Sequence, residues 1–224
     1  RYPVPEGESA VPGLECAGWV DALGPSCGDR YRPGQAVMAL LGGGGHAELV
    51  VVPAAQVLPV PTGWTWEEAG AFPEAALTAW TALVTEGHLQ PGAAVLVAGV
   101  TGGVGEVTAR MASLLGAGRV AGSSRDAGRL RALAAAGVEF DAIQEPPPPG
   151  PLVLPPGAFD LIVDLVGGPG AAARIAALAE GGRWVLLGLL AGRTAELDLT
   201  GVLRRRLCLC GSLLRPRSRA EKGA

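Results

Sequence analysis

Histidine, cysteine and charge are all scarce in this chain, and each shortage argues against a class of protein. The 224 residues include 2 histidines and 4 cysteines, and only 17% are charged against 49% hydrophobic, which is enough to bury a large core. Two histidines argue against a histidine-based metal centre, so we predict no metal site. The formal net charge of -3 gives no electrostatic reason to expect a nucleic-acid partner.

Long apolar runs are missing too, since none approaches the ~18 residues needed to span a bilayer, and no signal peptide is recognisable. The cysteines form no C-x-x-C pair, and Cys208 and Cys210 would face the same side of a strand-like run. This spacing favours buried thiols in a reducing compartment over a disulfide framework or a zinc site. We therefore expect a cytoplasmic protein with no membrane partner. There is no initiating methionine and the start reads as mid-domain, so we expect a fragment.

A tight glycine turn between a strand and a helix is the most informative motif. Residues 95–98 are a short apolar run typical of a strand, Gly99 and Gly102 follow it, and apolar residues recur at helical spacing from 104 to 115. Glycine adopts backbone angles closed to other residues and lets a diphosphate approach the main chain, while a helix N-terminus directs N–H groups at phosphates. This order predicts a dinucleotide-binding site.

The residues after the next expected strand, 119–122, indicate which dinucleotide is bound. NAD-specific folds usually carry an acidic residue there, about 20 residues beyond the turn, but this chain has Ser123, Ser124 and Arg125. Hydroxyl groups and a guanidinium would hold a 2′-phosphate that a carboxylate would repel. The sequence therefore favours NADP over NAD, and Asp126 is expected to cap the following helix.

Strand and helix patterns alternate from residue 93 onward. The expected strands cover 94–98, 119–122, 140–143, 161–165, 183–188 and 207–213, and the expected helices 103–115, 126–136, 171–179 and 199–205. This alternation predicts a doubly wound parallel sheet that binds its ligand at the carboxyl ends of the strands. The prolines of 145–157 predict a polyproline-like loop in place of one crossover helix.

The first part of the chain has a different pattern. Between residues 11 and 61, short apolar segments at 18–20, 36–40 and 48–52 are separated by glycine and proline, which predicts an irregular, mostly antiparallel domain. Residues 73–86 then have the spacing of a longer helix.

Motifs spread over nearly the whole chain occur in the order found in one family. They are residues 12–18, 24–25, 32–37, 44–48, 77–80, the glycine turn and 182–189. Together they resemble the zinc-free quinone oxidoreductases of the medium-chain dehydrogenase/reductase superfamily, the zeta-crystallin type. The resemblance implies an α/β fold with a partial, mostly antiparallel GroES-like β domain at 1–72, a doubly wound parallel Rossmann sheet at 73–214 and a polar tail at 215–224.

The resemblance also implies site residues. Tyr2 would be catalytic, orienting or protonating a quinone oxygen, and Leu14 stands where zinc-dependent relatives carry a histidine ligand. Leucine cannot coordinate a metal, which favours an acceptor that is already electrophilic. The residues expected to contact NADPH, from the resemblance or from their places at strand ends, are Thr78, Val100, Thr101, Gly102, Gly103, Val104, Ser123, Ser124, Arg125, Gly167, Leu187, Gly188 and Leu189.

The function implied by the resemblance is NADPH-dependent reduction of a quinone without zinc. Two alternatives stay open: a reductase of enones or enoyl thioesters on the same scaffold, and a catalytically silent NADPH-binding protein. Glu106 near the turn and the proline loop favour the second of these. Residues 207–213 resemble the edge strand by which family members extend their sheet across a dimer axis, so we predict a homodimer.

Overall fold

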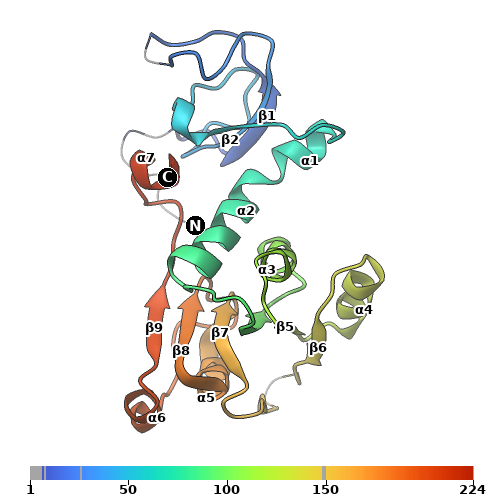
Figure 1. Ribbon diagram of the computed structural model, residues 1–224, viewed down its shortest axis with the longest axis vertical. Coiled ribbons are helices and arrows are strands. Elements are labelled where there is room, and N and C mark those ends of the chain that lie inside the picture. Colours follow the sequence, from blue (N-terminus) through green and yellow to red (C-terminus); the bar gives the residue numbers. More distant parts are fainter. Residues whose placement is uncertain (1–6, 8, 26, 148–149, 224) are drawn as a thin grey trace. The chain divides into compact units, whose positions relative to one another are not determined.

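The computed structural model describes residues 7, 9–25, 27–147 and 150–223. Its contacts divide the chain into two compact units. One contains the residues up to Leu77 together with those from Leu213 onward, and the other runs from Thr78 to Ser212. Figure 1 labels the helices and strands of both units.

The second unit is built on a six-stranded parallel sheet. Its strands lie in the order β6, β5, β4, β7, β8, β9, with β6 and β9 at the two edges (Figure 1). The strands are β4 (Ala94–Ala98), β5 (Arg119–Ser124), β6 (Asp141–Gln144), β7 (Phe159–Asp164), β8 (Leu178–Leu186) and β9 (Cys208–Gly211). Since the chain runs outward in both directions from β4, the sheet is doubly wound, as predicted.

Short helices accompany these strands. They are α3 (Gly103–Leu114), α4 (Ala127–Ala135), α5 (Ala171–Ala176) and α6 (Leu199–Arg204), so all four predicted helices are confirmed, with ends that differ by up to a few residues. Among the described residues no helix links β6 to β7, as the prolines predicted. On either side of the undescribed residues 148–149, the N–H of Gly150 donates to the carbonyl of Pro147 at 2.8 Å.

The sheet is apolar on both faces because it is covered on both faces. Val95 and Val97 of β4 pack in one core cluster with Ala109 and Ala112 of α3. Leu96, which points to the opposite face, packs in a second cluster with residues of β7 and of the segment after α5. A continuous apolar strand buried on two sides is the pattern typical of parallel sheets, and it fixes the position of the turn that follows β4.

Before β4, the predicted helix over 73–86 has two parts. It is α2 (Pro73–Trp80) continued by the π-helical segment η2 (Thr81–Thr85). None of the helices in the described part of the chain is long and apolar enough to cross a bilayer.

The first unit contains a three-stranded antiparallel sheet of β1 (Glu15–Trp19), β2 (Ala36–Leu40) and β3 (Val57–Pro59). The predicted strand over 48–52 is wrong, because the structure has no strand there and Val51 is fully exposed. The partner of β2 is instead β3, which follows the short helix η1 (Ala54–Gln56). An apolar run without a neighbouring strand to pair with has no ladder to join.

Two further helices belong to the first unit. A capping box begins α1 (Trp66–Gly70): the Thr65 side chain accepts from the N–H of Glu68, and the Glu68 side chain accepts from the N–H of Thr65. The predicted tail contains α7 (Arg219–Gly223), where Ser218 and Glu221 exchange the same pair of hydrogen bonds. The Ser-x-x-Glu spacing was a readable sign of this helix.

Candidate functional site

The glycine turn joins β4 to α3 at the carboxyl edge of the sheet. Gly99 has φ +84°, a left-handed conformation that L side chains rarely adopt. The amides of Gly99 and Val100 both donate to the carbonyl of Ser123, at 2.9 and 3.2 Å, which ties the turn to the end of β5. Gly102 is the N-cap of α3, and no side chain caps that end. The first N–H groups of α3 therefore remain available to a ligand.

The glycines of the turn differ in the space that a side chain would find around them. A Cβ atom on Gly105 would overlap the carbonyl oxygen of Gly99 and lie 2.8 Å from Cα of Val100, so helix and strand could not pack this closely. A Cβ atom on Gly103 would meet nothing within 4 Å. The packing glycine, Gly105, is absent from the predicted site, although its place three residues after Gly102 is a usual sign of this role.

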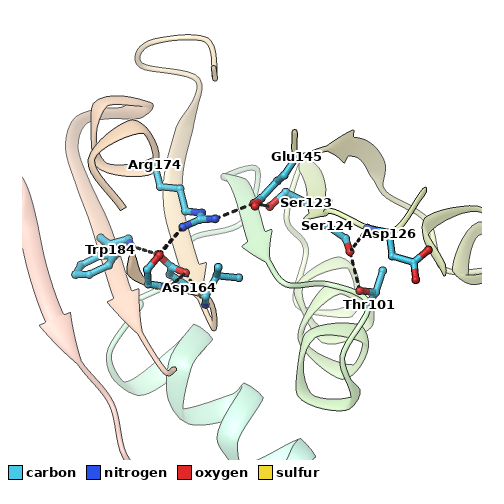
Figure 2. Close-up of polar contacts among 10 residues, drawn as sticks. Thr101, Ser123, Ser124, Asp126, Glu145, Asp164, Arg174 and Trp184 are labelled. Atoms are coloured by element: carbon cyan, nitrogen blue, oxygen red, sulfur yellow. Dashed lines mark hydrogen bonds and ion pairs between the residues drawn. The ribbon is translucent and has the colours of Figure 1, made fainter. Parts of the chain in front are cut away.

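The predicted diphosphate and 2′-phosphate residues are connected. The hydroxyl oxygens of Thr101 and Ser124 lie 2.9 Å apart, and the Ser124 oxygen also accepts from the N–H of Asp126 at 3.1 Å (Figure 2). Asp126 caps α4 by accepting from the N–H of Arg129 at 3.0 Å, which confirms the predicted cap. Arg125, between these residues, is exposed.

Ser123 is placed differently from its two neighbours. It is completely buried, and its hydroxyl donates to Oε1 of Glu145 at 2.6 Å. Glu145 follows β6 and is itself buried. The Ser123 side chain thus faces the interior, and of the three predicted 2′-phosphate residues only Arg125 is exposed.

Arg174 of α5 reaches the same carboxylate from the other side. Its guanidinium lies between Glu145 and Asp164 (Figure 2), with Nη2 2.8 Å from Glu145 Oε1 and Nη1 3.5 Å from Asp164 Oδ2. Trp184 Nε1 donates to Asp164 Oδ2 at 3.0 Å. Burial of these charges is tolerable because each has an opposite charge or a hydrogen-bond donor beside it.

Asp164 organises the predicted residues on the other side of the turn. Its Oδ1 accepts from the amides of Val166 and Gly167 at 2.8 and 2.9 Å, and its carbonyl accepts from the amides of Leu187 and Gly188 at 2.8 and 3.3 Å. The loops after β7 and β8 are therefore fastened to one residue at the end of β7. Leu189 follows them and is exposed.

Of the other predicted site residues, Thr78 lies half-buried on α2 and Tyr2 lies outside the described residues. Within the part of the chain that the structure describes, no three histidine, cysteine or acidic side chains lie together as a metal site would require. All four cysteines are free. Burial raises the pKa of the Cys16 and Cys210 thiols, and burial also raises the pKa of Glu15, whose Oε2 accepts from the N–H of Glu74 at 2.8 Å.

Comparison with protein-family models gives two matches. Residues 103–223 match the family described as zinc-binding dehydrogenase, and residues 1–62 match the alcohol dehydrogenase GroES-like domain. The two matches fall in both units and agree with the fold, a parallel sheet accompanied by a small antiparallel one.

Individual proteins are similar over most of this chain. Polyketide synthase GfsB from Streptomyces halstedii is 35% identical over 195 residues, which is 87% of this chain and 3% of that protein. A solved alcohol dehydrogenase superfamily protein from Novosphingobium aromaticivorans is 29% identical with a TM-score of 0.76, over 93% of this chain and 64% of that one. Mycobacterial Rv1454c, solved with NADPH, is 25% identical with a TM-score of 0.73, over 90% and 64%. The chain thus spans less than two thirds of each.

Proposed function

The chain belongs to the zinc-binding dehydrogenase family of the medium-chain dehydrogenase/reductase superfamily, and from this premise we propose that it is an oxidoreductase that binds NADPH and reduces a quinone. The observation that carries the proposal is the glycine turn beside Ser123, Ser124 and Arg125 at the carboxyl edge of a doubly wound sheet. The structural similarity to a protein solved with NADPH supports the same coenzyme.

The residues present fit this coenzyme. The space around Gly103 leaves room for a diphosphate against the main chain, and α3 begins without a side-chain cap. In the proposal, residues 100–104 surround the diphosphate, with the first amides of α3, those of Gly103 and Val104, donating to it. Ser124 lines the 2′-phosphate site and Arg125 pairs with that phosphate, while the buried Ser123 hydroxyl supports this site from within through its hydrogen bond to Glu145. Thr78, Gly167 and residues 187–189 border the nicotinamide. When bound, NADPH supplies a hydride.

The chain's own residues would orient the reactants and deliver a proton. The turn fixes the coenzyme by its backbone, which needs no rearrangement of side chains. In the proposal, the Tyr2 phenol orients or protonates a quinone oxygen. Leu14 has no metal-binding atom at the position of the histidine ligand, which supports an acceptor that needs no metal to polarise it.

A coenzyme titration followed by a turnover assay tests this function. We expect saturable NADPH binding, weaker NADH binding, and NADPH oxidation that depends on an added quinone. Absence of saturable binding would overturn the proposal at its first step. Binding without turnover of any acceptor would indicate the catalytically silent alternative.

A second candidate is reduction of an enone or enoyl thioester. The similarity to a segment of a polyketide synthase over 87% of this chain favours it. The same NADPH assay separates the two, because turnover of an enoyl-CoA without turnover of quinones would select the reductase of enoyl thioesters.

We also propose a homodimer formed through β9. No strand in the described part of the chain pairs with the outer side of β9, and an unpaired edge can add a strand from a second copy. Light scattering tests the proposal, and a mass equal to one chain at all concentrations would contradict it.

A further inference from the structure

Arg174 is the largest fully buried side chain of the described residues. It belongs to a short, alanine-rich helix, α5, and its guanidinium is removed from water with only 1% of the side chain exposed. Burying an arginine is unfavourable unless several partners surround it, and an apolar side chain of similar size often serves stability as well or better. The position of Arg174 therefore calls for a role besides stability.

The partners of Arg174 come from different strands of the sheet. Nη2 pairs with Glu145, which follows β6, while Nη1 pairs with Asp164 at the end of β7 and donates to the carbonyl of Gly167 at 3.2 Å. Its Nε has no hydrogen-bond partner among the described residues. One planar guanidinium thus connects the residue that follows β6 to the last residue of β7 in a fixed geometry.

Glu145 and Asp164 are hydrogen-bonded to different parts of the proposed coenzyme site. Glu145 accepts from the hydroxyl of Ser123, which directly precedes Ser124 and Arg125. Asp164 holds the loop after β7 through the amides of Val166 and Gly167, and the loop after β8 through its carbonyl. The contact of Glu145 thus lies on the adenosine side of the proposed site, and we call it the adenosine arm. The contacts of Asp164 lie on the nicotinamide side, and we call them the nicotinamide arm.

We propose that Arg174 is a positioning residue that couples the two halves of the coenzyme site through Glu145 and Asp164. The inference rests on the proposed NADPH function and deepens it. It predicts that the two arms can be weakened separately, and that loss of Arg174 weakens both.

The test uses three variants of the full chain and two half-coenzymes. The ligand 2′,5′-ADP probes the adenosine side, and reduced nicotinamide mononucleotide probes the nicotinamide side. We expect Glu145→Gln to weaken 2′,5′-ADP about tenfold, the equivalent of one hydrogen bond to a charged group, with nicotinamide mononucleotide within about twofold of wild type. Asp164→Asn should show the opposite pattern, and Arg174→Met should weaken both ligands.

Two controls separate positioning from folding. Arg119→Met removes an exposed ion pair with Asp141, 2.6 Å, at the amino ends of β5 and β6, and should change neither affinity. Should Arg174→Met fail to fold, Ser123→Ala removes only the hydroxyl that joins Glu145 to the adenosine side, and it should reproduce the selective loss of 2′,5′-ADP affinity. Circular dichroism and thermal unfolding report whether each variant is folded.

The possible outcomes lead to different conclusions. Folded variants that bind both half-coenzymes as wild type does, or that lose both affinities equally whichever carboxylate is changed, would overturn the inference and leave the proposed function standing. If the wild-type protein binds neither NADPH nor 2′,5′-ADP, the proposed function fails and the inference with it.

Discussion

Polar groups have different partners at the two ends of the strands of the six-stranded sheet, which we call its amino edge and its carboxyl edge. At the amino ends of the strands, the lining of a cavity of about 390 Å³ includes the polar side chains of His88, Asp160 and Arg183. Two of these hold the backbone locally: Asp160 accepts from the N–H of Ala94 at 2.8 Å, and Arg183 Nε donates to the carbonyl of Glu86 at 2.8 Å. At the carboxyl edge, hydrogen bonds between buried side chains connect the ends of β5, β6 and β7, through Ser123, Glu145, Arg174 and Asp164. The glycine turn lies at the same edge, and the helix that follows it has no side-chain cap.

This difference teaches that a cavity alone does not identify the candidate site. A dinucleotide is long and lies along the carboxyl ends of the strands, where it is held by backbone amides and a helix N-terminus. Side chains that line a cavity but are engaged in capping the ends of strands and helices offer less to such a ligand. Four substitutions, three at the carboxyl edge and one at the amino edge, test whether the coenzyme binds at the carboxyl edge.

Gly105→Ala should have the largest effect. The added Cβ overlaps the carbonyl oxygen of Gly99, so α3 must move away from β4. We expect a loss of stability of about 1–3 kcal/mol from overpacking, and no measurable NADPH binding. Thermal unfolding and a fluorescence titration give both values. Wild-type affinity in this variant would show that the turn does not hold the coenzyme.

Arg125→Ala tests the choice between NADPH and NADH. A charge-assisted contact with the 2′-phosphate is worth roughly 1.5–3 kcal/mol, so NADPH affinity should fall by about 10- to 100-fold, while NADH affinity stays the same. The matched control is Arg129→Ala, which removes an exposed pair with Asp126 at 3.7 Å and should alter neither coenzyme affinity. Equal losses for NADPH and NADH would refute the assignment of Arg125.

Gly103→Ala separates ligand binding from folding. The new methyl group meets no protein atom within 4 Å, so the fold should be unaffected. It nevertheless occupies space that we assign to the diphosphate, and we expect about a fivefold loss of NADPH affinity, equal to about 1 kcal/mol. An affinity equal to that of wild type would move the diphosphate away from this residue.

Arg183→Met at the amino edge should have the smallest effect. It removes the hydrogen bond to Glu86 and should cost about 1 kcal/mol of stability, with NADPH affinity unchanged. If this variant loses more NADPH affinity than Arg125→Ala does, the assignment of the two edges is reversed.

The sheet and the glycine turn could be predicted because local patterns determine them. Continuous apolar runs indicated the strands of a buried sheet, and glycine spacing indicated the turn. The strand over 48–52 could not be judged from its own residues, because pairing depends on which neighbour is free. In the structure β3 at Val57–Pro59 takes the place beside β2.

The buried network could not be predicted from the sequence. Arg174 stands in the segment Ala171–Ala176, where an arginine is usually a solvated helix residue. Its partners Glu145 and Asp164 are 29 and 10 residues away, and only the alignment of the parallel strands brings them together. For the same reason Ser123 and Ser124, equivalent in the sequence, face a buried carboxylate and the glycine turn respectively.

Hydrogen exchange of the backbone amides with and without NADPH tests the central claim most directly. At saturating coenzyme, we expect slower exchange in residues 100–106 and 123–126 at the carboxyl edge, and no change in residues 87–93 at the amino edge. Protection confined to residues 87–93, or none at the turn, would contradict the account.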